Sequence, residues 1–226
     1  ILINLQTTII GGSMWKKFII IIGLIFIVLL FSGCIGNTPE EAINSKISEK
    51  TFISETLGDW KADGVIGKDE YSHKISLNGG KFIAYWGNDD EYIYMGLRGQ
   101  SIGWVAIGFE PTNAMKDADM VFGWVKDGHV VVLDLYSTGT FGPHPLDESL
   151  GGTNDILEYG GIEENGYTTL EFKRKLDTKD KYDKAFVRGQ KIRFIWAMAD
   201  SDDLNVKHNI AKGFFINLRC LLCKKT

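Results

Sequence analysis

Apolar and polar residues alternate in short runs over most of the chain, from Tyr71 to Leu218. A period of two residues is typical of β-strands with one buried face, and these runs are rich in β-branched and aromatic residues. The runs cover residues 71–77, 81–87, 91–97, 103–109, 120–125, 129–136, 156–162, 167–172, 191–199 and 212–218. The pattern therefore predicts about ten or eleven strands.

Turn residues separate these runs and favour antiparallel pairing. Asp127-Gly128 and Asn165-Gly166 each lie between two runs, and such dipeptides accept the positive φ angles of a two-residue hairpin. The spacing is too short for crossover helices, and only residues 178–186 suggest a helical turn. These features predict an all-β fold, an immunoglobulin-like antiparallel β-sandwich.

The N-terminal pattern is different, because residues 14–34 resemble a secretory signal peptide. Two lysines precede an unbroken apolar run, Phe18–Phe31. As a helix this run spans about 21 Å, short of the ~30 Å of a bilayer core. Small residues then lead to Cys34, which resembles the lipobox of prokaryotic lipoproteins, where the thiol receives a lipid after cleavage. An uncleaved N-terminal membrane-anchor helix is the alternative.

These segments divide the chain into four parts. We expect a signal peptide with a lipobox over residues 1–34, a polar tether over 35–55, a folded domain over 56–219 and a tail over 220–226. Because Met14 is a natural start, it stays open whether residues 1–13 are translated. A lipid on Cys34 and a retained helix both predict that the domain lies at the outer, extracytoplasmic face of the cell membrane.

Charge and motifs exclude several functions. The formal net charge is −4 and no basic stripe is present, which argues against nucleic acid as a partner. We expect neither a G-x-S-x-G nucleophile elbow nor an H-E-x-x-H zinc site, and most carboxylate pairs lie in turns. Residues 200–205 could bind calcium weakly, although solvated turn acids are the simpler interpretation. Cys220 and Cys223 supply only two metal ligands, so a local disulfide or an inert tail is expected.

The four histidines differ in their surroundings. We expect His73 and His129 to be exposed at a strand and a hairpin edge, and His144 lies between two prolines in a loop. His208 lies in a polar loop before the last strand. Met115 has the same kind of surroundings, because it lies in the polar loop after the run that ends at residue 109.

Four segments together resemble the DOMON domain family. They are "WKADGVIGKDEY" (60–71), "GWVAIGFEPTNAMKDADMVFGWV" (103–125), "FKRKLDT" (172–178) and "HNIAKGFFINL" (208–218). The family includes the cytochrome domain of cellobiose dehydrogenase and the N-terminal domain of dopamine β-monooxygenase. Its fold is a β-sandwich, as the pattern of runs independently predicts. One departure is Lys175, where many relatives have Pro.

The resemblance implies a candidate cofactor. In cytochrome members of the family, haem b lies at one end of the sandwich between a Met and a His, and the matching residues here are Met115 and His208. With both axial positions filled, such a centre transfers electrons to a redox partner protein and is not an enzyme by itself. Residues that could form apolar walls for the porphyrin are Trp104, Phe109, Phe122 and Trp124.

Other members of the family bind no haem, which leaves two alternatives. One is a carbohydrate-binding or other ligand-binding module, with Trp86, Tyr92 or Trp196 as an exposed aromatic platform. The other is an interaction domain of the cell envelope. Whatever the ligand, we expect Asp119 to fix the Met115 loop by hydrogen bonds to backbone groups.

Overall fold

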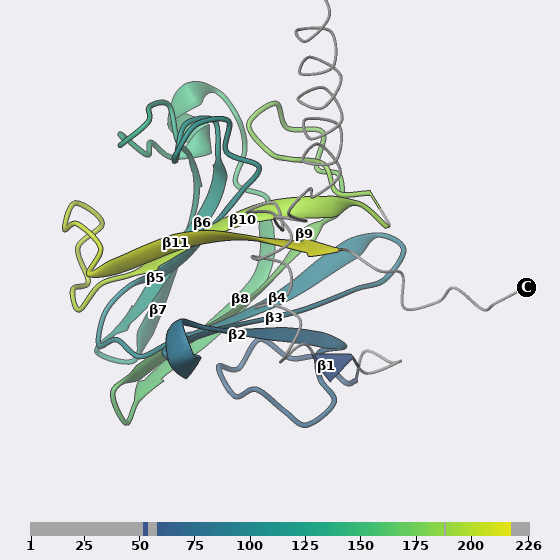
Figure 1. Ribbon diagram of the computed structural model, residues 1–226, viewed down its shortest axis with the longest axis vertical. Coiled ribbons are helices and arrows are strands. Elements are labelled where there is room, and N and C mark those ends of the chain that lie inside the picture. Colours follow the sequence, from purple (N-terminus) through teal and green to yellow (C-terminus); the bar gives the residue numbers. More distant parts are fainter. Residues whose placement is uncertain (1–51, 54–57, 188, 218–226) are drawn as a thin grey trace, which may run out of the picture. The chain divides into compact units, whose positions relative to one another are not determined.

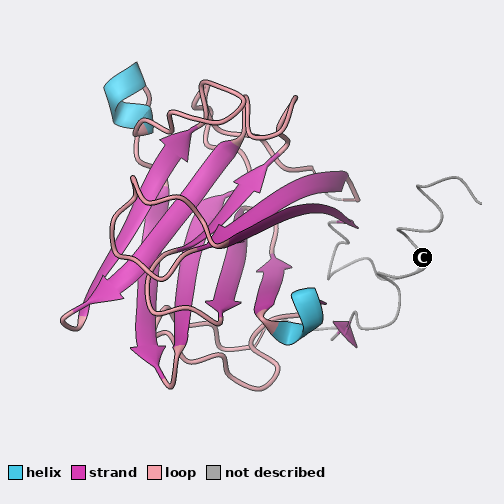
Figure 2. Ribbon diagram, turned by 60° about the vertical axis from the view of Figure 1, so that its left-hand side comes forward, coloured by secondary structure: helices cyan, strands magenta, loops and turns pink. Residues whose placement is uncertain are grey.

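The computed structural model describes residues 52–53, 58–187 and 189–217, which belong to one compact unit, Glu49–Thr226. Two antiparallel sheets lie face to face in this unit (Figure 1 and Figure 2). Across the first sheet the order is β1 (Phe52–Ile53), β2 (His73–Leu77), β3 (Phe82–Asn88), β4 (Tyr92–Gly99), β9 (Tyr167–Lys175) and β8 (Ile156–Glu164). Across the second it is β11 (Ile210–Asn217), β10 (Lys191–Met198), β5 (Val105–Phe109), β6 (Asp119–Lys126) and β7 (His129–Tyr136).

The prediction of a two-sheet antiparallel sandwich is confirmed. Each predicted run contains a strand, and the short β1 comes from the end of the predicted tether. Asp127-Gly128 joins β6 to β7 with φ angles of 51° and 76°, and Asn165-Gly166 joins β8 to β9 with 52° and 75°. These angles belong to the turn type that matches the twist of two paired strands.

Alternate residues of the central strands fill the space between the sheets. Val105, Ile107 and Phe109 of β5 are each at most 1% exposed. Gly123 of β6 lies against the opposite sheet, because a Cβ atom there would meet a Leu170 methyl group at 2.5 Å. The register pairs Val105 with Gly123, so both residues lie on the inner face of the five-stranded sheet.

An ion pair between Arg174 of β9 and Asp119 of β6 crosses the interior. Arg174 Nη1 donates to Asp119 Oδ1 at 2.9 Å and Nη2 donates to Oδ2 at 2.8 Å, and both side chains are 1% exposed. Asp119 Oδ2 also accepts the Lys184 amide. Our prediction that Asp119 fixes its own loop is wrong, because Asp119 begins β6 on the inner face and therefore meets Arg174.

The segment before β2 is held to the six-stranded sheet by Glu171, which is fully buried. Its carboxylate accepts the amides of Asp63 and Gly64 and the Tyr71 hydroxyl. The Trp60 indole donates in turn to the Tyr71 oxygen at 2.8 Å. Because this chain of hydrogen bonds begins on β9, residues 58–71 cover one face of that sheet.

Two further predictions are wrong. Residues 178–186 form no helix, and the only helical segments in the described ranges are the short 3₁₀ turns η2 (Asn78–Gly80) and η3 (Asp147–Leu150). His73 is 4% exposed, because its ring stacks on Trp86 with centroids 5.2 Å apart. His129 is exposed, as predicted.

The predicted signal peptide, Cys34 and the C-terminal cysteines lie outside the described residues. Among the residues that are described, no helix has the length and hydrophobicity needed to cross a membrane.

Candidate functional site

The outer face of the five-stranded sheet is apolar, which is unusual for a sandwich. Antiparallel sheets commonly bury one face and leave the other polar. In β5 and β6, both the residues that point into the sandwich and most of those that point outward are apolar. They form a cluster made of Trp104, Ala106, Ala118, Met120, Phe122, Leu135 and Ala199.

Small and large side chains alternate across this outer face. The register places Ala106 of β5 between Phe122 of β6 and Ala197 of β10, and it pairs Phe122 with Leu133 of β7. Trp104 lies beside Phe122 with ring centroids 4.9 Å apart. The aromatic rings therefore stand beside a strip of short side chains, and every member of the cluster is at most 6% exposed.

The loop between β5 and β6 brings Met115 onto this face. Met115 is half-buried and packs against the apolar cluster. Ala114 and Asp117 have φ angles of 50° and 61°, which make the loop a tight turn. The Met115 amide donates to the Thr140 carbonyl at 3.3 Å, and the Ala118 amide donates to the Met115 carbonyl at 3.1 Å. The loop is thus tied to the segment that follows β7.

Two histidines lie near the same face. The His144 ring lies 6.0 Å from the Phe122 ring between centroids, and His208 is half-buried in the loop between β10 and β11. Burial, together with the neighbouring charge of His208, lowers the pKa of His144 below its usual value. A low pKa keeps an imidazole neutral, and the neutral ring has a free nitrogen lone pair for a metal. Sequence reasoning missed His144, and its only signal was its place between two prolines.

Of the residues predicted to surround a cofactor, Met115, Trp104, Phe122 and Trp124 come together in or against the apolar cluster. Phe109 does not. It is fully buried between the sheets, where its ring meets Phe186 and Phe194 at 5.0 and 5.2 Å. The prediction for Phe109 fails because both sets of alternate residues in β5 are apolar. Hydrophobicity alone therefore does not show which set points outward.

The residues proposed for an aromatic platform are placed differently. Trp86 and Trp196 are each 2% exposed, stacked on His73 and Phe82. Buried indoles cannot stack on a sugar. Tyr92 remains half-exposed at the start of β4.

A separate hollow of about 400 Å³ lies at the junction of β4 and β10. Its lining includes Ser101, which stands in a G-x-S-x-G sequence, Gly99–Gly103, that sequence reasoning passed over. The Ser101 hydroxyl donates to the Ala199 carbonyl at 2.6 Å and is 3.2 Å from Asp200 Oδ1. A Cβ atom on Gly103 would lie 2.1 Å from the Ser201 amide nitrogen. The sequence therefore serves close packing between two turns rather than a nucleophile.

Two carboxylates of the loop at residues 200–205 accept hydrogen bonds from nearby backbone and side-chain groups. Asp200 accepts the Asn209 side-chain amide, and Asp203 accepts the backbone and side-chain amides of Asn205. Both acids thus act as turn acceptors.

The family profile of the DOMON domain matches residues 78–199, which is more than half of the chain. The chain belongs to the DOMON family. The predicted resemblance is therefore confirmed at the level of the family.

Among curated proteins, the DOMON domain is similar to DBH-like monooxygenase protein 1 of Mus musculus, at 32% identity over 133 residues. The match covers 58% of this chain and 21% of the mouse protein, so the chain spans about a fifth of that relative's length.

Among solved structures, the cytochrome b domain of pyranose dehydrogenase from Coprinopsis cinerea is similar, with a TM-score of 0.51 and 16% identity over 67% of this chain and 85% of that chain. The cytochrome domain of Myriococcum thermophilum cellobiose dehydrogenase has a TM-score of 0.46 and 12% identity, over 66% and 82%. At 16% identity, the likeness to the pyranose dehydrogenase domain shows a shared fold.

The outer face of the DOMON domain has the chemistry that a haem group needs. A thioether and two imidazoles lie in the loops around an apolar surface, and these are donors that iron accepts. Trp104 Nε1 and His144 Nδ1 are buried and have no hydrogen-bond partner in the described part of the chain. Buried polar atoms are normally paired, so both are available to a ligand. The donor set and the apolar surface thus fit haem.

Proposed function

We propose that this DOMON domain binds haem b on the outer face of its five-stranded sheet, with Met115 and His208 as axial ligands, and transfers electrons. The observation behind the proposal is the apolar outer face with Met115 packed against it. The cluster is at most 6% exposed, with Met115 and Leu204 packed against it, so a porphyrin would insert between this apolar face and the loops that carry those residues.

The residues of this face have separable roles. Trp104, Phe122 and Trp124 supply apolar walls that exclude water from the ligand. Met115 supplies a thioether, which raises a haem reduction potential, and His208 supplies an imidazole. When bound, haem b adds an iron that exchanges one electron. With both axial positions filled, no position is left for substrate, so the domain is proposed to be a carrier and not an enzyme.

The structural neighbour gives independent support. The pyranose dehydrogenase domain of the same fold is a cytochrome b domain by name. A carrier of this kind requires a redox partner protein, which we propose as the physiological partner.

Haemin titration of the purified protein tests the proposal. We expect one haem per chain and a sharp, low-spin Soret spectrum. Met115→Leu and His208→Ala should both turn the spectrum high-spin. Met198→Leu is the matched control, because Met198 is a buried strand residue outside the apolar cluster and a Met-to-Leu exchange conserves volume.

Two results would contradict the proposal. Absence of haem uptake by the wild-type protein would exclude the haem function, and glycan binding in its place would favour the carbohydrate alternative. A low-spin spectrum that survives His208→Ala but not His144→Ala would keep the haem and move the axial ligand to His144, which approaches the same face.

We also propose that the domain is tethered to the outer face of the cell membrane through a lipid on Cys34. The supporting observation is the apolar run followed by small residues and Cys34. In a bacterial host, labelled palmitate should enter the wild-type chain but not Cys34→Ala, with Cys220→Ala as the control. Label in the Cys34→Ala variant would contradict lipidation at this residue.

A further inference from the structure

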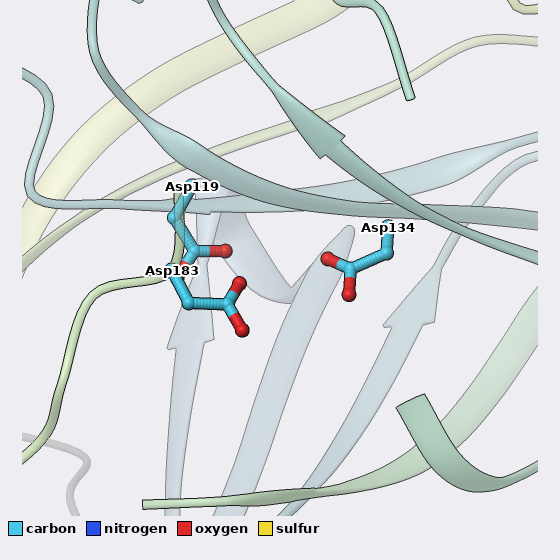
Figure 3. A group of neighbouring side chains, drawn as sticks. All are labelled: Asp119, Asp134 and Asp183. Carbon is cyan, nitrogen blue, oxygen red and sulfur yellow. The ribbon is translucent and has the colours of Figure 1, made fainter. Parts of the chain in front are cut away.

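A second cluster of polar side chains lies between the two sheets, away from the apolar outer face. Asp119, Asp134 and Asp183 each offer a carboxylate oxygen, and these oxygens lie within 4.8 Å of one another. Figure 3 shows the three carboxylates turned toward a common centre, with Asp134 opposite the other two. We call these residues, together with Asp147, the buried acidic cluster.

The sheet register brings the first two acids together. Asp134 of β7 pairs with Val121 of β6, and Asp119 lies two residues before Val121 on the same face. Asp183 comes from the loop after β9, and Asp147 begins η3. An isolated bridge between Leu135 and Leu146 holds η3 against β7. The hairpin of β6 and β7 and the loop after β9 thus bring three carboxylates together, and Asp147 lies near enough to feel their charge.

The charges in the cluster do not balance. Arg174 donates to Asp119 and to Asp183, and it is the one cation bonded to these acids in the described part of the chain. Four ionised carboxylates against one guanidinium leave a deficit of three positive charges. Buried charges without compensation are costly, so something else must neutralise them.

Several oxygens of the cluster also lack a hydrogen-bond partner. Asp134 Oδ2 accepts the Asp155 amide at 2.8 Å, whereas Asp134 Oδ1 has no partner among the described residues. The same holds for Asp183 Oδ2 and for both oxygens of Asp147. Asp134 is 2% exposed and Asp147 is 1% exposed. Unpaired carboxylate oxygens this deeply buried point to a ligand that accepts electron pairs.

We propose that the buried acidic cluster is a divalent-cation site, and that calcium is the cation it takes. Calcium binds six to eight oxygen ligands at about 2.3–2.6 Å in flexible geometry. Asp119, Asp134 and Asp183 supply its carboxylate oxygens, which lie within 4.8 Å of one another, and Asp119 also stays paired with Arg174. Magnesium is a poorer match, because it keeps several of its waters and demands octahedral geometry.

Without a cation, protons must supply the missing positive charge. Burial raises the pKa of Asp134 to about 8 and that of Asp147 to about 7, and the neighbouring charge of Asp183 adds to both effects. Bound calcium joins β6, β7 and the loop after β9. The cation thereby stabilises the end of the sandwich where the two sheets are bridged.

Calorimetric titration of calcium into the full-length, EDTA-treated chain in detergent tests this site. We expect one calcium per chain and a rise in Tm, since a ligand that binds only the folded state stabilises it. Asp134→Asn should weaken binding by about ten-fold or more, because it removes one negative ligand. Asp203→Asn is the control, since Asp203 is an exposed turn acid, and it should bind calcium as the wild type does.

A measurement without calcium separates a cation site from a purely structural role. In EDTA, Asp134→Asn should be about as stable as the wild type, because the amide is neutral, as the protonated carboxyl is, and keeps the shape of the side chain. Failure of the wild-type chain to bind calcium up to ~1 mM, or loss of binding in Asp203→Asn alone, would overturn the proposal. The calcium titration and the stability measurement use protein without haem, so their outcome does not depend on the proposed haem function.

Discussion

Arg174 and Asp119 form a bidentate ion pair that joins the two sheets through the interior of the sandwich. Neither partner reaches water, so each depends on the other for compensation. Arg174 also lies against apolar rings, with its guanidinium carbon 5.4 Å from the centre of Phe109 and 5.1 Å from that of Phe186. The pair therefore fixes how one sheet is placed over the other.

Removing one partner of this pair should cost more than removing both. Arg174→Leu should lower the free energy of unfolding by about 3–5 kcal/mol, because it leaves buried carboxylates without their cation. Arg174→Leu with Asp119→Leu should recover part of that loss. Urea denaturation measures all three proteins, and a double variant less stable than Arg174→Leu would contradict the account.

Glu171 should make stability depend on pH. Burial is the main cause that raises the pKa of Glu171 from 4.5 to about 7. The unfolded chain loses this proton near pH 4.5 and the folded chain loses it near pH 7, so the contribution of Glu171 is fully present below pH 4.5 and is lost as pH rises through 7. Measured in EDTA, Glu171→Gln should flatten the decline in Tm between these values. An unchanged pH profile would contradict this role.

Phe109 and Phe122 should respond differently to truncation, because they lie on opposite faces of one sheet. Phe109→Ala opens a cavity in the core and should cost about 3–5 kcal/mol of stability. Phe122 is also buried, so Phe122→Ala should cost stability too, but it alone should lower haem affinity by about ten-fold or more, since it removes an apolar wall. Chemical denaturation measures the stability of both variants, and haemin titration measures their haem affinity. A loss of haem affinity in Phe109→Ala but not in Phe122→Ala would contradict the placement of the two residues.

Gly160 should tolerate no side chain. A Cβ atom there would lie 1.9 Å from the Ala62 carbonyl oxygen, so the segment before β2 would have to leave the sheet. Gly160→Ala should lower Tm by several degrees. Gly213→Ala is the control, because its Cβ atom would meet nothing closer than 3.3 Å. Equal Tm values for the two variants would show that residues 58–71 do not pack as described.

The sequence predicted the strands and both hairpins because their signals are local. Alternation marks a strand, and Asp-Gly or Asn-Gly marks a turn, whatever the distant packing. The outward face of β5 was not predictable in this way, since "WVAIGF" is apolar in both phases. The contact between Gly123 and Leu170 shows which residues of this sheet face the other sheet.

The buried charges left a signal that could have been used. Three charged residues lie on the inward side of their strands, where the neighbours two positions away are apolar. They are Asp119, Asp134 and Arg174, and the neighbours are Val121, Val132 and Phe172. Opposite charges at inward-pointing positions of two strands predict an ion pair across the interior. Asp183 gave no such signal, because its loop was expected to be helical. Similarly, nothing local to His144 indicated that it would approach Phe122.

The central claim is that the Met115 thioether binds haem iron, and proton NMR of the reduced, haem-loaded protein tests it most directly. The ε-methyl group of an axial Met lies over the porphyrin, so the ring current moves its resonance far upfield. We predict one such methyl signal, present in the wild type and in Met198→Leu and absent in Met115→Leu. A haem-loaded wild-type spectrum without that signal, or with the signal retained in Met115→Leu, would contradict the claim.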